Sequence, residues 1–424
     1  MTSGSLAGND SFVNRFPEII SCLYFAAETE ESEATDVAGH KRHKKHTYTL
    51  DTIPEGIPTK QVEHRLEGEV LVCPQCGDTM TEIDKEVVKT LEIIPARYIV
   101  REDIYYTYAC KSCGENADEG CEKPVVKAPR EKKIIPGSFA TPEAIAYIMT
   151  QKFAMGSPLY RQEQELNRRG IQLSRQTMSN WILRATEDYL TPIYDRLHEE
   201  LLKREVLHAD ETTLQVLHDP GKAPKSNSYM WLYRTSGDTD RPIVLYEYQP
   251  GRGGKHPKEF LAGFHGYLHT DGYTGYHNLP EEITVVGCWA HTRRKFDEAV
   301  KSLPKGKAKD SSTPKSALGK ASTYLNEQWP YLTNYLKDGR LELSNNRAER
   351  SIKPFVIDRK NFLFANTPKG AKGSAIMFGL VQTAIENGLD PYQYLTWLLK
   401  TANTADLDDI EVVQSRADIF WNDI

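Results

Sequence analysis

The stretch from residue 206 to residue 300 places the strongest constraint on the fold. Three β-rich segments follow one another, VLHADETTLQVL, YMWLYRTS and PIVLYEYQ, and turns rich in Gly, Pro and Asp join them. HPKEFLAGF then has a helical pattern, GYLHTDGY and ITVVGCWA have strand patterns, and HTRRKFDEAV is helical again. Runs of β-branched and aromatic residues between turn residues are typical of strands. Three strands followed by helix, strand and strand predict an α/β domain with a mixed sheet.

Two aspartates stand at strand ends in this stretch. Asp210 closes VLHAD, within or at the end of its strand, and Asp271 closes YLHTD. Burying a carboxylate there costs free energy unless the group is paired or binds a cation. Each also has a simpler interpretation, since Asp210 can cap a turn and Asp271 can begin the turn DGYTG. Both follow the pattern His-x-Asp, however, and two neighbouring strands that bring carboxylates to one end of a sheet would form a site for a hard cation.

A third carboxylate, Glu349, lies in SNNRAERSIKPF, residues 344–355. Asn346 and Glu349 have the spacing of a capping box, with Asn in place of Ser or Thr, and Glu349 forms an i,i+4 pair with Lys353. These features favour an ordinary helix start. They leave unexplained a density of cations that suits phosphate contacts interleaved with aromatic side chains. The cations are Arg347, Arg350, Lys353, Arg359, Lys360, Lys369 and Lys372, and a second basic group at another helix start is His291, Arg293, Arg294 and Lys295.

Two pairs of cysteines have the spacing of zinc ligands. CPQCG holds Cys73 and Cys76, and CKSCG holds Cys110 and Cys113. Two such CxxC knuckles can present four thiolates tetrahedrally to one Zn²⁺, whereas the alternative is a set of unconnected structural cysteines. The chain has seven cysteines, an odd number that fits reduced thiols and a metal site better than a disulfide framework. Nearby, RYIVRED and IYYTYAC alternate between apolar and polar residues and predict short strands.

Residues 140–205 have helical patterns. TPEAIAYIMTQKFAM begins with Thr-Pro, a helix-start signal. SPLYRQEQELNRRG predicts a helix that breaks at Gly170, and a second helix is expected to begin near Ser174. This arrangement resembles a helix-turn-helix, with Arg175, Gln176 and Ser179 on the recognition helix. A helical hairpin that serves only packing would have the same pattern, so the sequence leaves both alternatives open.

The composition of the whole chain limits its function class. The 424 residues allow about two to four domains, and 39% hydrophobic with 26% charged residues is typical of a globular protein. A formal net charge of −6 means that any nucleic-acid binding must come from local basic patches. No apolar run reaches the length of a membrane span and the N-terminus lacks a signal-peptide pattern, which predicts a cytoplasmic protein with no membrane partner. Acidic FAAETEESEATD followed by basic HKRHKKH predicts a poorly structured tail, either solvated or touching phosphate.

Taken together, these segments resemble the transposases of the insertion sequence 66 family. The matching motifs, in order, are CPQCG with YACKSCG, SPLYRQEQELNRRGIQLSRQTMSNW, VLHADETTLQVL, HTDGYTGY, GCWAHTRRKFDEA and DGRLELSNNRAERSIKPFVIDRKNFLF. They cover roughly residues 40–400, nearly the whole chain. The resemblance implies a multidomain α/β protein with a ribonuclease-H-like mixed-sheet catalytic core. A small zinc-binding β-rich module and a helix-turn-helix-like region would precede that core.

The resemblance also implies an activity and a set of site residues. Asp210, Asp271 and Glu349 would form an Asp-Asp-Glu triad with two catalytic Mg²⁺ ions, beside a structural Zn²⁺. The protein would cleave DNA strands at element ends and transfer them to target DNA. Its partners would be double-stranded DNA of the terminal repeats and target, further copies of itself on DNA and accessory proteins of the same element, with a nucleoid-associated location. The expected DNA-binding residues are Arg175, Gln176, Arg293, Arg294, Asn346, Arg347, Arg350, Lys353 and Arg359.

The domain organisation follows from these assignments. We expect a disordered basic tail (1–50), a zinc-binding module (51–125), a linker (126–139), a helical DNA-binding region (140–205), a catalytic domain (206–400) and a C-terminal tail (401–424). The lysine-rich loop at 301–316 stands where the family carries a longer helical insertion, so we expect a shortened insertion there. This departure and the shorter N-terminal region leave an alternative, a catalytically inactive zinc-dependent DNA-binding relic or repressor. An unrelated nuclease on the same core, without preference for element ends, is a further alternative.

Overall fold

A computed structural model describes residues 75, 78, 97–109, 125–302 and 316–404. These residues fall into two units, which divide between Arg130 and Glu131. The four cysteines predicted to bind zinc, the expected N-terminal tail and most of the lysine-rich loop lie outside the described residues, as does the expected C-terminal tail beyond residue 404, since residues 401–404 form the end of helix α13. No helix in the described ranges is long and apolar enough to cross a membrane.

In the described part of the N-terminal unit, two short strands pair. β1 (Thr107–Ala109) is antiparallel to β2 (Val125–Lys127), with Thr107 opposite Lys127. β1 lies within IYYTYAC, as predicted, whereas residues 97–103, RYIVRED, have no regular structure, and that prediction is wrong. Residues 97–103 are exposed throughout, so their alternation has no buried face to stabilise a strand.

The other unit contains a five-stranded mixed sheet in the order β5-β4-β3-β6-β7. β3, β4 and β5 form an antiparallel meander, while β6 and β7 extend the sheet in parallel to β3. The mixed α/β fold predicted from the segment 206–300 is therefore confirmed. The strands are β3 (Val206–Gln215), β4 (Asn227–Thr235), β5 (Val244–Gln249), β6 (Gly266–His269) and β7 (Ile283–Val286).

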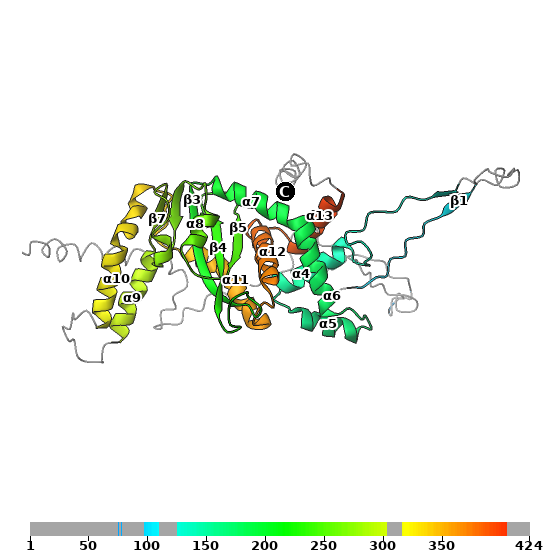
Figure 1. Cartoon of the computed structure of the whole chain (residues 1–424), viewed down its shortest axis with the longest axis horizontal. Coiled ribbons are helices and arrows are strands. Elements are labelled where there is room, and N and C mark those ends of the chain that lie inside the picture. The colour runs from blue at the N-terminus through cyan, green and yellow to red at the C-terminus, as the bar shows by residue number, and fades with distance from the viewer. Residues whose placement is uncertain (1–74, 76–77, 79–96, 110–124, 303–315, 405–424) are drawn as a thin grey trace, which may run out of the picture. The chain divides into compact units, whose positions relative to one another are not determined.

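Helices before and after the sheet complete this unit (Figure 1). The first group is α4 (Pro142–Phe153), α5 (Leu159–Arg168), α6 (Arg175–Ala185), the π-helical turn η3 (Thr186–Leu190) and α7 (Thr191–Leu202). Short helices α8 (Lys255–Phe260) and η4 (Thr274–Tyr276) flank β6. The last group is α9 (Trp289–Lys301), α10 (Ala317–Leu332), η5 (Thr333–Lys337), α11 (Asn346–Phe362), α12 (Pro368–Glu386) and α13 (Pro391–Thr404).

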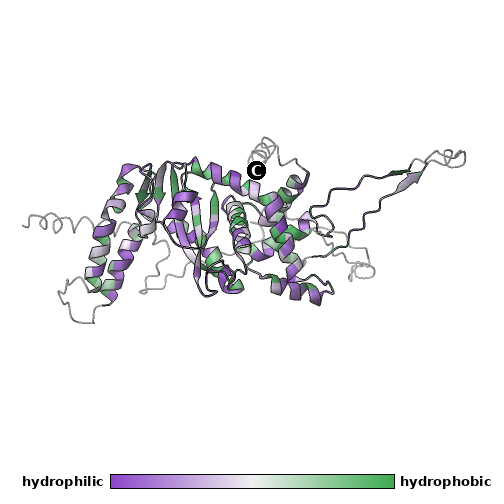
Figure 2. Ribbon diagram, in the orientation of Figure 1, coloured by the Kyte–Doolittle hydropathy of each residue, from purple (hydrophilic) through white to green (hydrophobic). Residues whose placement is uncertain are grey.

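Aromatic packing fixes α11 and α12 against the sheet. Tyr246 of β5, Phe355 of α11 and Phe378 of α12 are fully buried, and the two phenylalanine rings meet edge to face at 5.2 Å. Full burial of one such side chain contributes about 1.5–3 kcal/mol to stability. Figure 2 shows the hydrophobic strands of the sheet beside helices α9 and α10, whose surfaces carry many hydrophilic residues. The core thus holds α11, the helix that carries Glu349, in a fixed place.

Candidate active site

The two aspartates lie side by side on neighbouring parallel strands. His208 of β3 is in register with His269 of β6, so Asp210 and Asp271 stand two residues further along each chain. Equivalent positions on parallel strands face the same side of a sheet. Asp210 is the fifth residue of the ten-residue β3, within the strand, and Asp271 lies two residues after the end of β6. The repeated His-x-Asp pattern is therefore a matter of strand register.

The two histidines of this pattern, His208 and His269, are buried, and their rings stack. Their ring centroids are 4.4 Å apart and the rings are nearly parallel, at 12°. His208 Nδ1 is 3.0 Å from Asn345 Oδ1, and His269 Nε2 accepts a hydrogen bond of 3.3 Å from the backbone N–H of Glu342. Burial lowers the pKa of His208 well below its ordinary value, and the charge of His269 lowers it further. Burial lowers the pKa of His269 to about 4, so both rings are neutral near pH 7.

Asn345 connects this stack to the start of α11. Its Nδ2 donates to Ala209 O at 2.8 Å, and its backbone N–H donates to Cys288 Sγ at 3.1 Å. α11 begins at Asn346, so Asn345 is the N-cap, and its side chain makes no hydrogen bond to the helix. The predicted capping box, with Asn346 as the cap, is therefore wrong, because Asn346 is already helical and the amide of the true cap is used by β3.

Glu349 completes a pocket with the two aspartates. A pocket of about 250 Å³ is lined by Asp210, Asp271, His291, Arg294, Asn345, Glu349, Ile352 and Lys353. The Glu349 carboxylate lies 3.6 Å from His291 Nε2 and 3.7 Å from Arg294 Nη2, both on α9. Its buried Oε1 makes no hydrogen bond. The basic group of α9 therefore faces the third carboxylate across the pocket.

Burial and neighbouring charges make the ionised form of Asp210 unfavourable. Burial raises the pKa of Asp210 well above its ordinary value, and the charges of Glu211, Asp271 and Glu349 raise it further, while the N–H of Glu211 lowers it. A cation would relieve this repulsion, and carboxylate oxygens are the ligands that Mg²⁺ prefers. Within the described ranges, however, no three His, Cys, Asp or Glu side chains are grouped closely enough to hold a metal ion. Asp210 and Asp271 thus carry oxygen donors of the type that Mg²⁺ prefers, whereas Glu349 lies beside His291 and Arg294 of α9.

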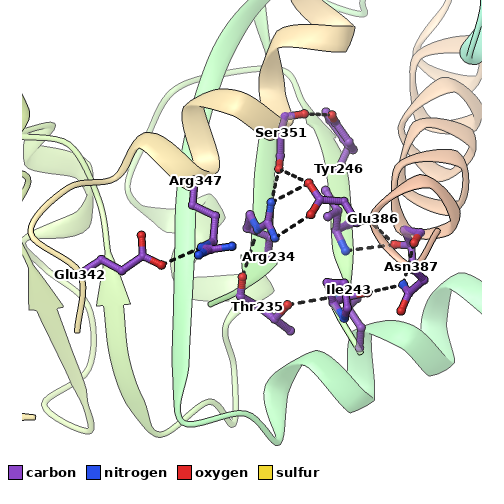
Figure 3. Close-up of polar contacts among 12 residues, drawn as sticks. Arg234, Thr235, Ile243, Tyr246, Glu342, Arg347, Ser351, Glu386 and Asn387 are labelled. Carbon is purple, nitrogen blue, oxygen red and sulfur yellow. Dashed lines mark hydrogen bonds and ion pairs between the residues drawn. The ribbon is translucent and has the colours of Figure 1, made fainter. Parts of the chain in front are cut away.

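A buried ion pair holds α11 two residues beyond Glu349 (Figure 3). Arg234 of β4, only 2% exposed, binds Glu386 at the end of α12 through two hydrogen bonds of 2.8 and 3.2 Å. It also donates to Ser351 Oγ of α11, which donates to Glu386 Oε1 at 3.2 Å. The hydroxyl of Tyr246 donates to the backbone carbonyl of Ser351. Asn345 and Ser351 thus anchor α11 on either side of Glu349.

The residues predicted to bind DNA differ in their surroundings. Two of the arginines are engaged within the protein: Arg347 donates to Glu342 at 2.7 Å (Figure 3), and Arg359 donates to both Thr212 and Thr213 of β3. Asn346 is a half-buried first residue of α11. The other six are exposed, although three of them also have partners: Arg175 pairs with Glu163, Gln176 donates to Asn180 and Arg294 pairs with Glu349. These six are Arg175 and Gln176 at the start of α6, Arg293 and Arg294 on α9, and Arg350 and Lys353 on α11.

Sequence reasoning missed a second set of charged residues beside the pocket. Glu211, next to Asp210, binds Arg252, and neither was singled out as a site residue. The glycine-rich segment GRGG around Arg252 is the one local signal that could have indicated it. Arg234 and Glu386 were missed as well, because 152 residues separate them in the chain.

A mixed α/β domain with a carboxylate pocket of this kind can be compared with known families. Residues 137–313 and 306–373 match the Transposase IS66 family, and residues 71–114, which include both CxxC pairs, match the zinc-finger binding domain of transposase IS66. The chain belongs to the IS66 transposase family. The two matches to the Transposase IS66 family overlap at residues 306–313, within the lysine-rich loop at 301–316.

Three proteins of Sinorhizobium fredii are similar along much of this chain. The uncharacterized protein y4jD is 29% identical over 410 residues, which are 82% of this chain and 77% of y4jD. The uncharacterized protein y4qI is 32% identical over 65% of this chain, which spans 62% of y4qI. The uncharacterized protein y4hP is 26% identical over 88% of this chain and 78% of its own length.

Proposed function

We propose that this protein is a DNA transposase that catalyses metal-dependent DNA strand cleavage and strand transfer at element ends, with Asp210, Asp271 and Glu349 as its catalytic carboxylates. One observation carries the proposal: these three side chains come from β3, from the end of β6 and from α11, and line one pocket. The sheet order supports it, since an antiparallel meander joined to two parallel strands fits the ribonuclease-H-like core that the family resemblance implies.

In this proposal the chain positions the reacting groups. Two bound Mg²⁺ ions would supply an activated oxygen nucleophile and neutralise charge on the scissile phosphate. Asp210 and Asp271 supply oxygen ligands from adjacent strands, and Glu349 adds a third carboxylate from α11. Arg294 and Lys353 bring positive charge to the same pocket, where the DNA phosphate would bind. Water or a DNA 3′-hydroxyl gives up its proton to solvent and forms the new bond to phosphorus, while the bond from phosphorus to the displaced oxygen breaks and that oxygen keeps the electron pair and takes up a proton from solvent.

The direct test uses the full chain with duplex DNA that carries the terminal repeats flanking its gene. With Mg²⁺ or Mn²⁺ we expect cleavage at the repeat ends and joining of the ends to a second DNA molecule. Loss of both products on chelation would support the metal requirement. Equal cleavage of unrelated DNA would favour a general nuclease and contradict the proposal.

The inactive relic or repressor is a second candidate, and one observation favours it. Glu349 faces His291 and Arg294, and the part of the chain that the structure describes holds no group of three ligands close enough for a metal. If this candidate is right, the protein binds the terminal repeats but does not cleave them, whichever divalent ion is added. The same assay therefore decides between the two functions.

We extend the proposal to α5 and α6 as the helix-turn-helix that reads the terminal repeats. Ser174 caps α6, its Oγ accepting from the N–H of Thr177 at 3.1 Å, and Gly170 makes the preceding turn at φ +80°. Arg175 and Gln176 are exposed in the first turn of α6, the part of a recognition helix that contacts base edges.

Replacing Gln176 with Ala should weaken binding to the terminal repeat by about 1–3 kcal/mol, the cost of losing one base contact. Binding to unrelated DNA should change little, because a base contact adds nothing to non-specific affinity. Fluorescence anisotropy with both duplexes measures the difference. Gln393→Ala, at an exposed position of α13, is the matched control. An equal loss on both DNAs would show that α6 does not read sequence.

We also propose that Cys73, Cys76, Cys110 and Cys113 hold a structural Zn²⁺ in the N-terminal unit. The support is the donor set, two CxxC pairs within the segment that matches the zinc-finger domain. Cys110→Ser should lower the zinc content measured by mass spectrometry from about one ion per chain to a small fraction, since a structural site needs all four ligands. Cys121→Ser, which alters a cysteine outside the pairs, should keep the metal. Equal zinc in both variants would refute this ligand set.

A further inference from the structure

An arginine outside the predicted site is held rigidly beside the carboxylate pocket. Arg252 lies in the loop between β5 and α8. Its Nε and Nη2 donate to Glu211 Oε1 at 2.7 and 2.5 Å. The Glu211 side chain is only 1% exposed, whereas that of Arg252 is 42% exposed. A buried carboxylate therefore fixes one edge of the guanidinium, and the rest of the group faces solvent.

Two tyrosines also hold Arg252 and Glu211 in place. The Arg252 guanidinium lies over the Tyr273 ring, 3.8 Å from its centroid, and the Tyr273 hydroxyl donates to the Arg252 carbonyl. The hydroxyl of Tyr276 donates to Glu211 Oε2 at 2.7 Å, so both oxygens of that carboxylate are occupied. Stacking and a paired carboxylate together leave the guanidinium little freedom, which reduces the entropy lost when it binds a ligand.

Two of the residues that hold Arg252 in place are next to, or bonded to, the proposed catalytic aspartates. Glu211 follows Asp210 on β3 and points to the other face of the sheet, because side chains alternate along a strand. The N–H of Tyr273, whose ring supports Arg252, donates to Asp271 Oδ1 at 2.9 Å. Burial alone would lower the pKa of Arg252, but its hydrogen bonds to Glu211 and the charge of Asp271 raise it. Tyr273 thus links the Arg252 guanidinium to Asp271, which lines the pocket, although Arg252 itself is not among the lining residues.

The hydrogen bonds to Glu211 use only part of the Arg252 guanidinium. Nε and Nη2 serve Glu211, while Nη1 makes no hydrogen bond within the part of the chain that the structure describes. An arginine presents five donors in a planar fork that matches phosphate. The solvent-facing edge of Arg252 is thus an oriented, permanently charged donor set next to carboxylates that are themselves expected to bind metal and phosphate.

We propose that Arg252 binds a phosphate of the DNA strand that enters the carboxylate pocket, on the Asp271 side of that pocket. This inference rests on the proposed function, since it takes DNA as the ligand. Glu211, Tyr273 and Tyr276 are positioning residues that hold the guanidinium toward that phosphate.

The test is the salt dependence of DNA binding by the full chain, measured with terminal-repeat duplex and Ca²⁺ to prevent cleavage. Each phosphate contact contributes about 0.9 to the slope of log K against log salt concentration. Arg252→Gln should therefore reduce the slope by about 0.9 and the affinity about tenfold at low salt. Arg252→Lys should keep part of the affinity, because it keeps the charge but loses the fork. An unchanged slope for Arg252→Gln would overturn the inference.

Two further variants separate a phosphate contact from effects of charge or folding. Arg340→Gln is the matched control, because Arg340 is likewise about 43% exposed and paired with carboxylates, Glu205 and Asp338; its slope should stay that of the wild type. The double variant Glu211→Gln/Arg252→Gln removes one charge of each sign, so the formal charge is unchanged and no carboxylate is left buried and unpaired. The double variant should still show the reduced slope. Recovery of the wild-type slope would show that Arg252 only neutralises Glu211.

The outcome is independent of the cleavage assay. A reduced slope in a protein that cleaves no DNA would leave Arg252 as a phosphate contact of a DNA-binding protein, while the proposed catalysis fails. An unchanged slope in a protein that cleaves terminal repeats would remove Arg252 from the site and leave the transposase function in place.

Discussion

Asp210→Asn should reduce cleavage of terminal-repeat DNA by about a thousandfold or more, the loss expected when a metal-assisted step forfeits several kcal/mol of stabilisation. The same change should raise the thermal stability of the protein without divalent ions. Burial and the neighbouring Glu211 and Asp271 raise the pKa of Asp210, which means that its ionised form is unfavourable in the fold. A neutral amide removes that repulsion and still accepts the 2.8 Å hydrogen bond from the N–H of Glu211.

Opposite changes in activity and stability distinguish this result from simple unfolding. Mg²⁺ or Mn²⁺ should raise the melting temperature of the wild type, because an ion that binds only the folded state stabilises it. Asp210→Asn should lose most of this increase. Asp240→Asn, at an exposed turn between β4 and β5, is the control and should match the wild type in both assays. Cleavage by Asp210→Asn at the wild-type rate, or an unchanged metal response, would contradict the assignment.

The strands and the two aspartates could be predicted because their signals are local. Each strand of the sheet is a short run of β-formers between turns, and Asp271 follows such a run directly, whereas Asp210 lies within one. The pattern His-x-Asp indicated more than either residue alone, and the structure gives the reason in the register of β3 and β6. Parallel strands in register convert a repeated short pattern into neighbouring side chains, so a repeat of this kind can predict proximity.

Charge density along the chain was a weaker guide to the DNA-binding surface. Arg347 and Arg359 belong to the basic cluster around Glu349, yet they bind Glu342 and two threonines of β3. A linear count of cations cannot separate an arginine that faces solvent from one that faces a partner on another element. Arg252 shows the converse, because it stands alone in the sequence but is oriented by Glu211, 41 residues earlier.

The anchoring of α11 was beyond sequence reasoning for the same physical reason. Arg234, Ser351 and Glu386 come from a strand and two helices, and only the packed core brings them together. A buried arginine has no local signature in a strand such as YMWLYRTS, where it alternates with aromatic residues. The helix pattern predicted α11, but not what holds it in place.

The ion pair between Arg234 and Glu386 should lose different amounts of stability depending on which partner is replaced. Arg234 is 2% exposed, while the Glu386 side chain is 31% exposed. Glu386→Gln leaves a buried cation with a weakened partner and should lower the free energy of unfolding by about 3 kcal/mol, the low end of the range for breaking a buried pair, because the Glu386 side chain is partly exposed. Arg234→Met should cost less, because an apolar side chain replaces the buried charge and Glu386 can turn toward solvent. Urea denaturation followed by tryptophan fluorescence measures both.

The double variant Arg234→Met/Glu386→Gln tests the cause of the asymmetry. It should be more stable than Glu386→Gln alone, because the uncompensated cation is gone. Glu187→Gln breaks an exposed pair with Lys369, in which both side chains are 61% exposed, and should change stability by less than about 0.5 kcal/mol. A Glu386→Gln protein more stable than Arg234→Met would refute the argument.

The cleavage activity of Arg234→Met tests whether the ion pair between Arg234 and Glu386 helps to position Glu349. Ser351 loses its bond to Arg234 in this variant, and Glu349 is only two residues away on the same helix. We therefore expect a folded Arg234→Met protein to bind terminal-repeat DNA with wild-type affinity and to cleave it about tenfold more slowly, as when a catalytic group loses its precise placement. The wild-type cleavage rate in this variant would mean that Asn345 and the aromatic core alone hold Glu349 over the two aspartates.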